Sequence, residues 1–459
     1  MKEGSSSIAS IGIIPSGSRS RSTGPSPVAS YAMWTSPDFA YRGPDSTAML
    51  QDANDAQMAG RGRFLFVTLD GGGNVPPALG LCRHLRAAGH SVRVIAPRTL
   101  RKRIEGAGCE FQPFPADLEW DPAKGRAIED QEDAWDAIVC GVLLAETVLA
   151  EVEREPADVL VVDCLLRNAL SAAERTGLPT VGLVHVRYGF WQGDFDFDED
   201  DWEWGLACAN EARGRLGLEP ITRGDPAVWP SVRLLDRCTR ALVVLPREFE
   251  DPDVLPAANA RYVGPVFEED DWAVPWDLPW PVDRPDPLVV VSFSTTYMHQ
   301  EEAVARVMAA LEGLPVRALV TLGPELEPAE VPAPSWVEVR RYVPHAAVLP
   351  HASLVVTHAG MGTVMAALAY GVPMLCIPLD RDQPKNAERV RALGAGNAIA
   401  SDAPVEVVRA AIVEALGSEE LRAGAKRMAE IVASYGRGAR AIDELEALLA
   451  ESRRGDLNP

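Results

Sequence analysis

Short apolar runs with β propensity alternate with helical segments twice along the chain, and this alternation restricts the fold more than any other feature. In the first series, FLFVTL (64–69) is followed by a glycine turn, a segment with helical spacing and a second apolar run at 91–97. Strand–turn–helix–strand units of this kind build parallel sheets with helices on both faces. A second series begins at 287–294. The sequence therefore predicts an α/β protein of two doubly wound, Rossmann-like domains facing a central cleft, with ligands bound at the carboxyl ends of the strands.

Composition sets the predicted boundaries. Residues 1–61 are rich in Ser, Gly and Pro, and we predict a disordered tail there. An N-terminal domain follows at 62–267. The proline-rich stretch 268–287 suits neither a helix nor a central strand, so we expect an interdomain linker. A C-terminal domain is predicted at 288–434, and a C-terminal helix at 435–459 that packs back on the N-terminal domain.

Charge and cysteine content exclude several classes of protein. The chain has 44 Lys and Arg against 66 Asp and Glu, a net charge of −22, which disfavours nucleic acid as a partner. The seven cysteines are scattered without a CxxC pair or Cys/His cluster, which indicates no zinc site and a reducing, cytoplasmic environment. No run of about 18 apolar residues is present, so we expect no transmembrane segment.

The stretch THAGMGT, which follows the apolar run ending at Val356, carries the most informative chemistry. His358, Gly360, Gly362 and Thr363 lead from a strand into a helix. A helix start presents free N–H groups and a partial positive charge, and glycines allow a phosphate to approach the backbone. This pattern predicts a diphosphate cradle without Walker-A spacing. Such turns are common, so the pattern alone leaves a purely structural turn equally open.

The wider segment 342–388 resembles the nucleotide-sugar signature of family 1 glycosyltransferases, and the bacterial macrolide and antibiotic enzymes look nearest. The resemblance is carried by ordered anchors: Val343-Pro344-His345, His358-Ala359-Gly360, Gly362-Thr363, Gly371-Val372-Pro373 and Asp382-Gln383-Pro384-Lys385-Asn386. It extends more loosely over residues 63–450. It implies the GT-B fold, with an acceptor-binding N-terminal domain and a nucleotide-sugar-binding C-terminal domain.

The resemblance also implies roles for individual residues. Tyr342 takes the place of the aromatic that stacks on the donor base, and the backbone of Val343 should bond that base. The diphosphate is expected near Ser294, Thr295, Thr296, His358, Gly360, Gly362 and Thr363. Asp382 and Gln383 should bind sugar hydroxyls, although a solvated turn before a helix is the competing interpretation. The implied co-substrate is a UDP- or TDP-sugar, with no other cofactor and no metal.

The chain departs from the family pattern at the catalytic base. The family usually places a His in a Gly-His-x-x-Pro turn, and here the turn reads Gly73-Asn74-Val75-Pro76-Pro77. Asn cannot accept a proton at neutral pH. Asp163 is the first alternative candidate and Asp70 the second, while Asp163 could equally cap the next helix. An acceptor that ionises easily, an amine acceptor, carbon–carbon bond formation and lost activity also stay open.

The acceptor site is predicted from the stretch 187–204, where aromatic and acidic residues alternate. Phe190 and Trp191 could line a hydrophobic acceptor site, and His185 could face the same cleft. A solvated acidic loop with buried Trp anchors, and a structural His185, are the competing interpretations.

The predicted function is inverting, metal-independent transfer of a sugar to a small, hydrophobic natural-product acceptor. A sugar-nucleotide epimerase on the same fold and a non-catalytic nucleotide-sugar-binding partner are the alternatives. The sequence leaves the sugar, the acceptor, the uracil or thymine base and the oligomeric state open.

Overall fold

The described part of the chain consists of two parallel α/β halves. The computed structural model describes residues 60–118, 132–191, 199–224, 229–268, 275–281, 285–294, 298–323, 328 and 333–457. The predicted tail 1–61 therefore falls outside the described residues, apart from its last two positions. Of the predicted linker, the segments 275–281 and 285–287 contain neither helix nor strand.

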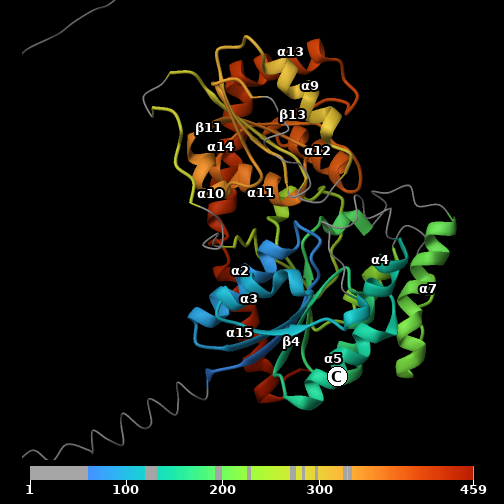
Figure 1. The fold of residues 1–459 in the computed structure, drawn as a ribbon. Helices are drawn as coiled ribbons and strands as arrows, with labels where there is room; N and C mark the ends of the chain where they lie inside the picture. The colour runs from blue at the N-terminus through green and yellow to red at the C-terminus, as the bar shows by residue number, and fades with distance from the viewer. Residues whose placement is uncertain are drawn as a thin grey trace, which may run out of the picture. The chain divides into compact units, whose positions relative to one another are not determined.

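The first half is built on sheet A, whose described strands are all parallel and run in the order β3-β2-β1-β4-β5-β6-β7. β4 thus lies between β1 and β5, and because the three strands are parallel, the turns that follow β1 and β5 flank its carboxyl end. Figure 1 labels β4 within this half. The elements of this half are β1 (Arg63–Val67), α2 (Val75–Ala87), β2 (Ser91–Ala96), α3 (Arg101–Gly106), β3 (Glu110–Pro113), α4 (Glu132–Val139), α5 (Val142–Arg154), β4 (Val159–Asp163), α6 (Arg167–Thr176), β5 (Thr180–Val184), α7 (Glu199–Leu216), α8 (Pro230–Leu235), β6 (Arg240–Val243) and β7 (Ala260–Tyr262).

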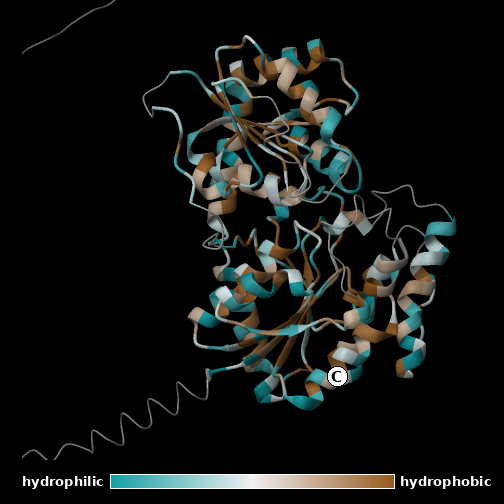
Figure 2. Ribbon diagram, viewed as in Figure 1, coloured by the Kyte–Doolittle hydropathy of each residue, from teal (hydrophilic) through white to brown (hydrophobic). Residues whose placement is uncertain are grey.

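Alternation of side chains along β1 explains why helices cover both faces of sheet A. Successive residues of a strand point to opposite faces. Phe64 and Phe66 pack in one buried cluster with α2, α3 and the C-terminal helix, whereas Leu65 and Val67 pack in another with α5 and α6. Figure 2 shows the strands as the most hydrophobic part of this half, with mixed helices around them. A strand buried on both faces is apolar throughout, as FLFV is.

The second half repeats this architecture on sheet B, whose described strands are parallel and run in the order β10-β9-β8-β11-β12-β13. Val289 and Val291 of its central strand pack against α9 and α13, and Leu288 and Val290 face the opposite cluster. The elements are β8 (Leu288–Ser292), α9 (Glu301–Leu311), β9 (Arg317–Thr321), β10 (Val337–Arg340), α10 (His345–Val348), β11 (Ala352–Thr357), α11 (Met361–Tyr370), β12 (Met374–Cys376), α12 (Gln383–Ala392), β13 (Gly396–Ala398), α13 (Val405–Gly417) and α14 (Glu419–Ser434).

The C-terminal helix α15 (Ala439–Arg454) belongs to the core of the first half. Its buried residues Ala441, Leu445, Leu448 and Leu449 lie in the same cluster as β1 and α2. Burying a leucine side chain contributes about 1.5–3 kcal/mol. The last helix of the chain therefore ties the second half of the sequence to the first sheet.

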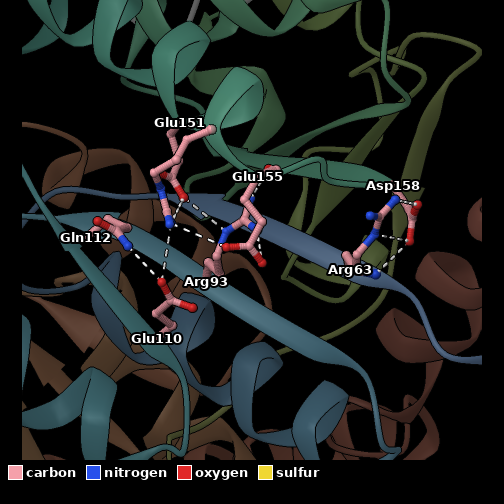
Figure 3. Close-up of polar contacts among 8 residues, drawn as sticks. Arg63, Arg93, Glu110, Gln112, Glu151, Glu155 and Asp158 are labelled. Atoms are coloured by element: carbon pink, nitrogen blue, oxygen red, sulfur yellow. Dashed lines mark hydrogen bonds and ion pairs between the residues drawn. The ribbon is translucent and has the colours of Figure 1, made fainter.

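An ion-pair network braces the edge of sheet A near β2 and α5 (Figure 3). Arg93 is buried on β2 and pairs with Glu151 at 3.1 Å and with Glu155 at 2.6 Å. Arg154 bonds the same Glu151 at 2.8 Å. Arg93 and Glu151 are both nearly excluded from water, and each also has a more exposed partner, Glu155 for Arg93 and Arg154 for Glu151.

Several features of the fold have no signal in the sequence. β3 and β13 extend the two sheets, and Cys140 and Cys208 form a disulfide between residues 68 positions apart. The scattered cysteine spacing predicted no such pair, because the two residues become neighbours only when the helices pack. The other five cysteines are free and buried. Within the described residues, no helix has the length and apolar character that crossing a membrane requires.

Candidate active site

Asn74 occupies the turn between β1 and α2, where both ends of its side-chain amide are hydrogen-bonded. Its Nδ2 donates to Oδ2 of Asp163 at 2.8 Å and to the Leu69 carbonyl at 2.9 Å, with the Thr68 hydroxyl further away at 3.3 Å. Its Oδ1 accepts from the Gly71 N–H at 3.0 Å. The residue is 3% exposed. Asn74 is therefore a fixed, buried brace that ties the turn to the end of β4.

Asp163 ends β4, and its carboxylate is fully buried. Besides the Asn74 bond, Oδ1 accepts from the Leu165 N–H at 3.0 Å and lies 3.1 Å from Nε2 of His185, and the Thr68 hydroxyl is 3.4 Å from Oδ2. Four groups thus surround the two oxygens. The carboxylate therefore contacts only its protein neighbours. Because it is fully buried, an acceptor hydroxyl cannot reach it.

His185 follows β5 and reaches Asp163 from the side opposite Asn74. Its side chain is 8% exposed. Burial lowers the pKa of His185, but the neighbouring Cys164 and the Asp163 carboxylate raise it more, so this pKa lies well above the ordinary histidine value. The sequence predicted His185 only as an acceptor contact. The structure brings it into the same hydrogen-bonded cluster as Asp163 and Asn74.

The other predicted residues of the first half have simpler surroundings. Asp70 is partly exposed on the loop after β1 and accepts a hydrogen bond from the Thr99 hydroxyl at 2.6 Å. Trp191 is 2% exposed and belongs to the core, with Phe190 edge-on against it at 5.8 Å between ring centroids. Trp191 is thus a buried anchor, and Phe190 is the half-buried member of the pair. The neighbouring segment 192–198 of the predicted acceptor loop lies outside the described residues.

The predicted phosphate turn joins β11 to α11. Gly360 is the N-cap of α11, and Gly362 is exposed in its first turn. A Cβ on Gly360 would lie 2.2 Å from Nε2 of His358, so only glycine fits beside this imidazole. The Thr363 side chain is buried one residue further on. The free N–H groups of the helix start are thereby left open to an anion.

His358 is neutral in this environment. Burial lowers its pKa to about 4, although a backbone hydrogen bond at Ser292 raises it in part. Its ring stacks on Phe293 at 6.2 Å between centroids. A neutral imidazole still donates one hydrogen bond, so His358 can contact a phosphate as a donor but adds no charge.

Asp382 and Gln383 begin α12. Asp382 accepts a hydrogen bond from Nδ2 of Asn386 at 2.8 Å, and burial raises its pKa. Oε1 of Gln383 accepts from the backbone N–H groups of Leu379 at 2.9 Å and Asp380 at 3.2 Å. The glutamine oxygen therefore fastens the loop before α12, and a sugar would meet Asp382 more directly.

The predicted base-binding residues lie after β10, in the loop that leads to α10. Tyr342 is 39% exposed, and Val343 is buried. Ser294 is buried after β8. Thr295 and Thr296 lie outside the described residues.

The two glycine turns approach each other across the halves. A Cβ on Gly362 would lie 4.0 Å from Cα of Gly73. Arg187, two residues after His185, donates to the Lys385 carbonyl of α12 at 3.0 Å and pairs with Asp251 at 2.8 Å. This contact could not be predicted, because nothing in the sequence around Arg187 shows which helix it meets.

A metal site is not assigned among these residues. Asp163, Cys164 and His185 each offer an atom of ligand type, all within 4.8 Å of one another. Both oxygens of Asp163 already accept hydrogen bonds, one from Asn74 and one from Leu165. We therefore interpret the cluster as a hydrogen-bond network and not as a metal site.

Comparison with solved structures defines the class of this fold. The calicheamicin glycosyltransferase CalG4 superposes with a TM-score of 0.69 at 24% identity, covering 85% of this chain and 98% of that one. The glycosyltransferase VinC, solved in complex with dTDP, gives a TM-score of 0.59 at 19% identity, covering 85% of this chain and all of that one. The chain has the GT-B glycosyltransferase fold, as predicted.

Sequence comparison gives the more specific placement. Residues 305–448 match the model of the C-terminal domain of erythromycin biosynthesis protein CIII-like proteins. The chain is 27% identical over 431 residues to 4'-demethylrebeccamycin synthase of Lentzea aerocolonigenes, covering 84% of this chain and 99% of that protein. It is 28% identical over 399 residues to oleandomycin glycosyltransferase of Streptomyces antibioticus, covering 82% and 88%. The chain is thus a homologue of antibiotic glycosyltransferases.

Proposed function

We propose that this protein transfers a sugar from a UDP- or TDP-sugar to a small, hydrophobic natural-product acceptor, with inversion at the anomeric carbon and without a metal ion. One observation carries the proposal. The glycine turn at the start of α11 lies opposite the turn after β1. A donor diphosphate bound at the α11 turn would therefore face the first half of the protein, which is expected to bind the acceptor.

The turn before α11 suits a leaving diphosphate. When the bond between the anomeric carbon and the diphosphate breaks, negative charge grows on the diphosphate oxygens. The N–H groups of the helix start and the His358 side chain are fixed before the reaction, so they stabilise that charge without rearranging. No cofactor beyond the nucleotide sugar is required for this step.

Sugar recognition falls to the start of α12. Asp382 supplies a carboxylate there, and Gln383 holds the preceding loop in place. The exposed Tyr342 provides the stacking surface for the nucleotide base. Because VinC was solved with dTDP, thymine is the first base to test.

The acceptor class rests on the relatives. They are named oleandomycin glycosyltransferase, aklavinone 7-beta-L-rhodosaminyltransferase and 4'-demethylrebeccamycin synthase. The half-buried Phe190 and the buried Trp191 directly precede the loop expected to contact the acceptor.

A donor screen followed by product analysis tests the proposal. Thermal shift with UDP- and TDP-sugars identifies the native donor, since a ligand at 100 times its Kd stabilises by about 2.7 kcal/mol. The bound donor, isotopically labelled, is then incubated with and without a panel of aromatic and macrolide aglycones. A glycosylated aglycone supports transfer. Donor epimerised without acceptor, or donor bound without any turnover across the panel, would overturn it.

A further inference from the structure

Of Asn74, Asp163 and His185, His185 is the residue that combines a basic atom with an exposed surface. Asp163 has no exposed surface, and Asn74 has no basic atom. His185 has both a basic ring and a small exposed surface. Its Nε2 lies 3.1 Å from Oδ1 of Asp163. The pKa of His185 is raised, so the neutral ring forms only above that pKa. In the neutral ring Nε2–H donates to that carboxylate, and Nδ1 carries the lone pair that accepts a proton.

Sheet order explains how three residues far apart in sequence meet. β4 lies between β1 and β5, and all three strands run parallel. Asn74 comes from the turn after β1, Asp163 ends β4 and His185 follows β5. The carboxylate is therefore held on one side by an amide that cannot titrate and on the other by an imidazole that can.

The chain just after His185 contacts the second half of the protein, which is expected to bind the donor. Arg187, two residues later, bonds the Lys385 carbonyl in the first turn of α12 at 3.0 Å. The charge of His185 acts on Asp382 at the start of the same helix. The segment that carries His185 therefore contacts the helix whose start is proposed to hold the sugar.

We propose that His185 is the general base of the transfer, that Asp163 orients its ring, and that Asn74 positions the carboxylate. The inference rests on the proposed transferase function. In one displacement, the acceptor oxygen bonds the anomeric carbon, and the bond from that carbon to the diphosphate breaks. The acceptor proton moves to Nδ1 of His185, and the nucleoside diphosphate leaves with the bonding electron pair.

Single-turnover transfer by His185→Gln tests this assignment directly. Gln keeps a donor that can bond Asp163 but has no basic nitrogen. We expect the transfer rate to fall about 10²–10⁴-fold, while affinity for the nucleoside diphosphate stays within twofold of wild type. His84→Gln, an exposed histidine on α2, is the matched control and should transfer at the wild-type rate. A His185→Gln rate within threefold of wild type would overturn the assignment, while wild-type transfer in the same assay would leave the proposed function intact.

A spectroscopic readout does not depend on finding the acceptor. In ¹⁵N-histidine-labelled protein, the imidazole of His185 should carry its proton on Nε2 when neutral. Its titration should move to lower pH in Asp163→Asn. The charged or titratable groups that act on this ring are Asp163 and Cys164 beside it and Asp382 from α12. A ring that is protonated on Nδ1, or a titration that Asp163→Asn leaves unchanged, would contradict the proposed dyad.

Discussion

The variant Asp163→Asn tests whether the Asp163 carboxylate orients the ring of His185 or only stabilises the fold. The substitution keeps the size of the side chain but replaces one oxygen by an NH₂ group. In wild type, Oδ2 accepts from Nδ2 of Asn74 at 2.8 Å, and Oδ1 accepts from the Leu165 N–H at 3.0 Å and faces His185 at 3.1 Å. An amide can keep only one of these two acceptor positions.

The magnitude follows from the bonds that cannot be rebuilt. If the new NH₂ replaces Oδ2, it points its hydrogens at the NH₂ of Asn74. Rotating Asn74 does not solve this, because its Oδ1 accepts from Gly71 and its Nδ2 also donates to Leu69. One buried donor is left without an acceptor, at a cost of about 1–3 kcal/mol, and the charge of a carboxylate that accepts several hydrogen bonds is also lost. We expect a net loss of about 2–4 kcal/mol in unfolding free energy.

The pH dependence of the stability difference gives a more specific test. The pKa of His185 in the folded wild type lies above its ordinary value, so its contribution to stability is complete below about pH 6.5 and is lost as pH rises through the raised pKa. In Asp163→Asn the carboxylate no longer raises the pKa of His185, whereas burial still lowers this pKa. The stability difference between the two proteins should therefore be larger at pH 6 than at pH 9.

Two assays check this reasoning. Urea denaturation at pH 6 and pH 9 measures the stability difference, and the single-turnover pH–rate profile measures the base. We expect the Asp163→Asn rate to fall about 10²–10⁴-fold and the acid limb of its profile to move to lower pH. An equal stability difference at both pH values, together with an unmoved acid limb, would show that Asp163 does not act on His185.

Three further predictions concern other parts of the chain. His358→Ala should weaken nucleoside diphosphate binding by about 10- to 100-fold, because a hydrogen bond to a charged group is lost. Calorimetry measures this affinity, and an unchanged value would show that His358 does not contact the phosphate. Removing residues 1–58 should leave the melting temperature and transfer rate unchanged, because the remaining chain forms its own compact unit; a loss of either would show that the removed segment packs on it. Replacing Cys140 and Cys208 by Ser should cost about 4 kcal/mol from the loop of 68 residues, measured by denaturation, with mass spectrometry of the alkylated wild type showing whether the bond forms.

The sequence predicted those strands that are apolar on both faces. FLFVTL and the runs at 158–163 and 353–360 stand out because a doubly covered parallel strand excludes polar residues. β13 (Gly396–Ala398) and β3 (Glu110–Pro113) are short edge strands, and their sequences GNA and EFQP carry no apolar run. These two edge strands are held by ladder hydrogen bonds to a neighbour, and their own composition does not reveal them.

The candidate site shows the same limit. The turn from His358 to Thr363 could be predicted because its chemistry is local: glycines, a strand end and a helix start. The pairing of His185 with Asp163 could not be read from spacing, since the residues are 22 positions apart. Only the adjacency of β4 and β5 brings them together. A signal was nevertheless present, because both residues follow or end apolar strands.

The position of β4 within sheet A allows the proposed base to come from the turn after β5 instead of the turn after β1. A carboxylate at the end of the central strand can be reached from the turns after both β1 and β5. If one turn supplies the imidazole, the other need supply only a group that holds the carboxylate. Asn74 does this better than a histidine could, because its amide satisfies Leu69, Gly71 and Asp163 at once. Asn at the usual histidine position is therefore compatible with catalysis, and it makes His185 the residue on which the proposed reaction depends.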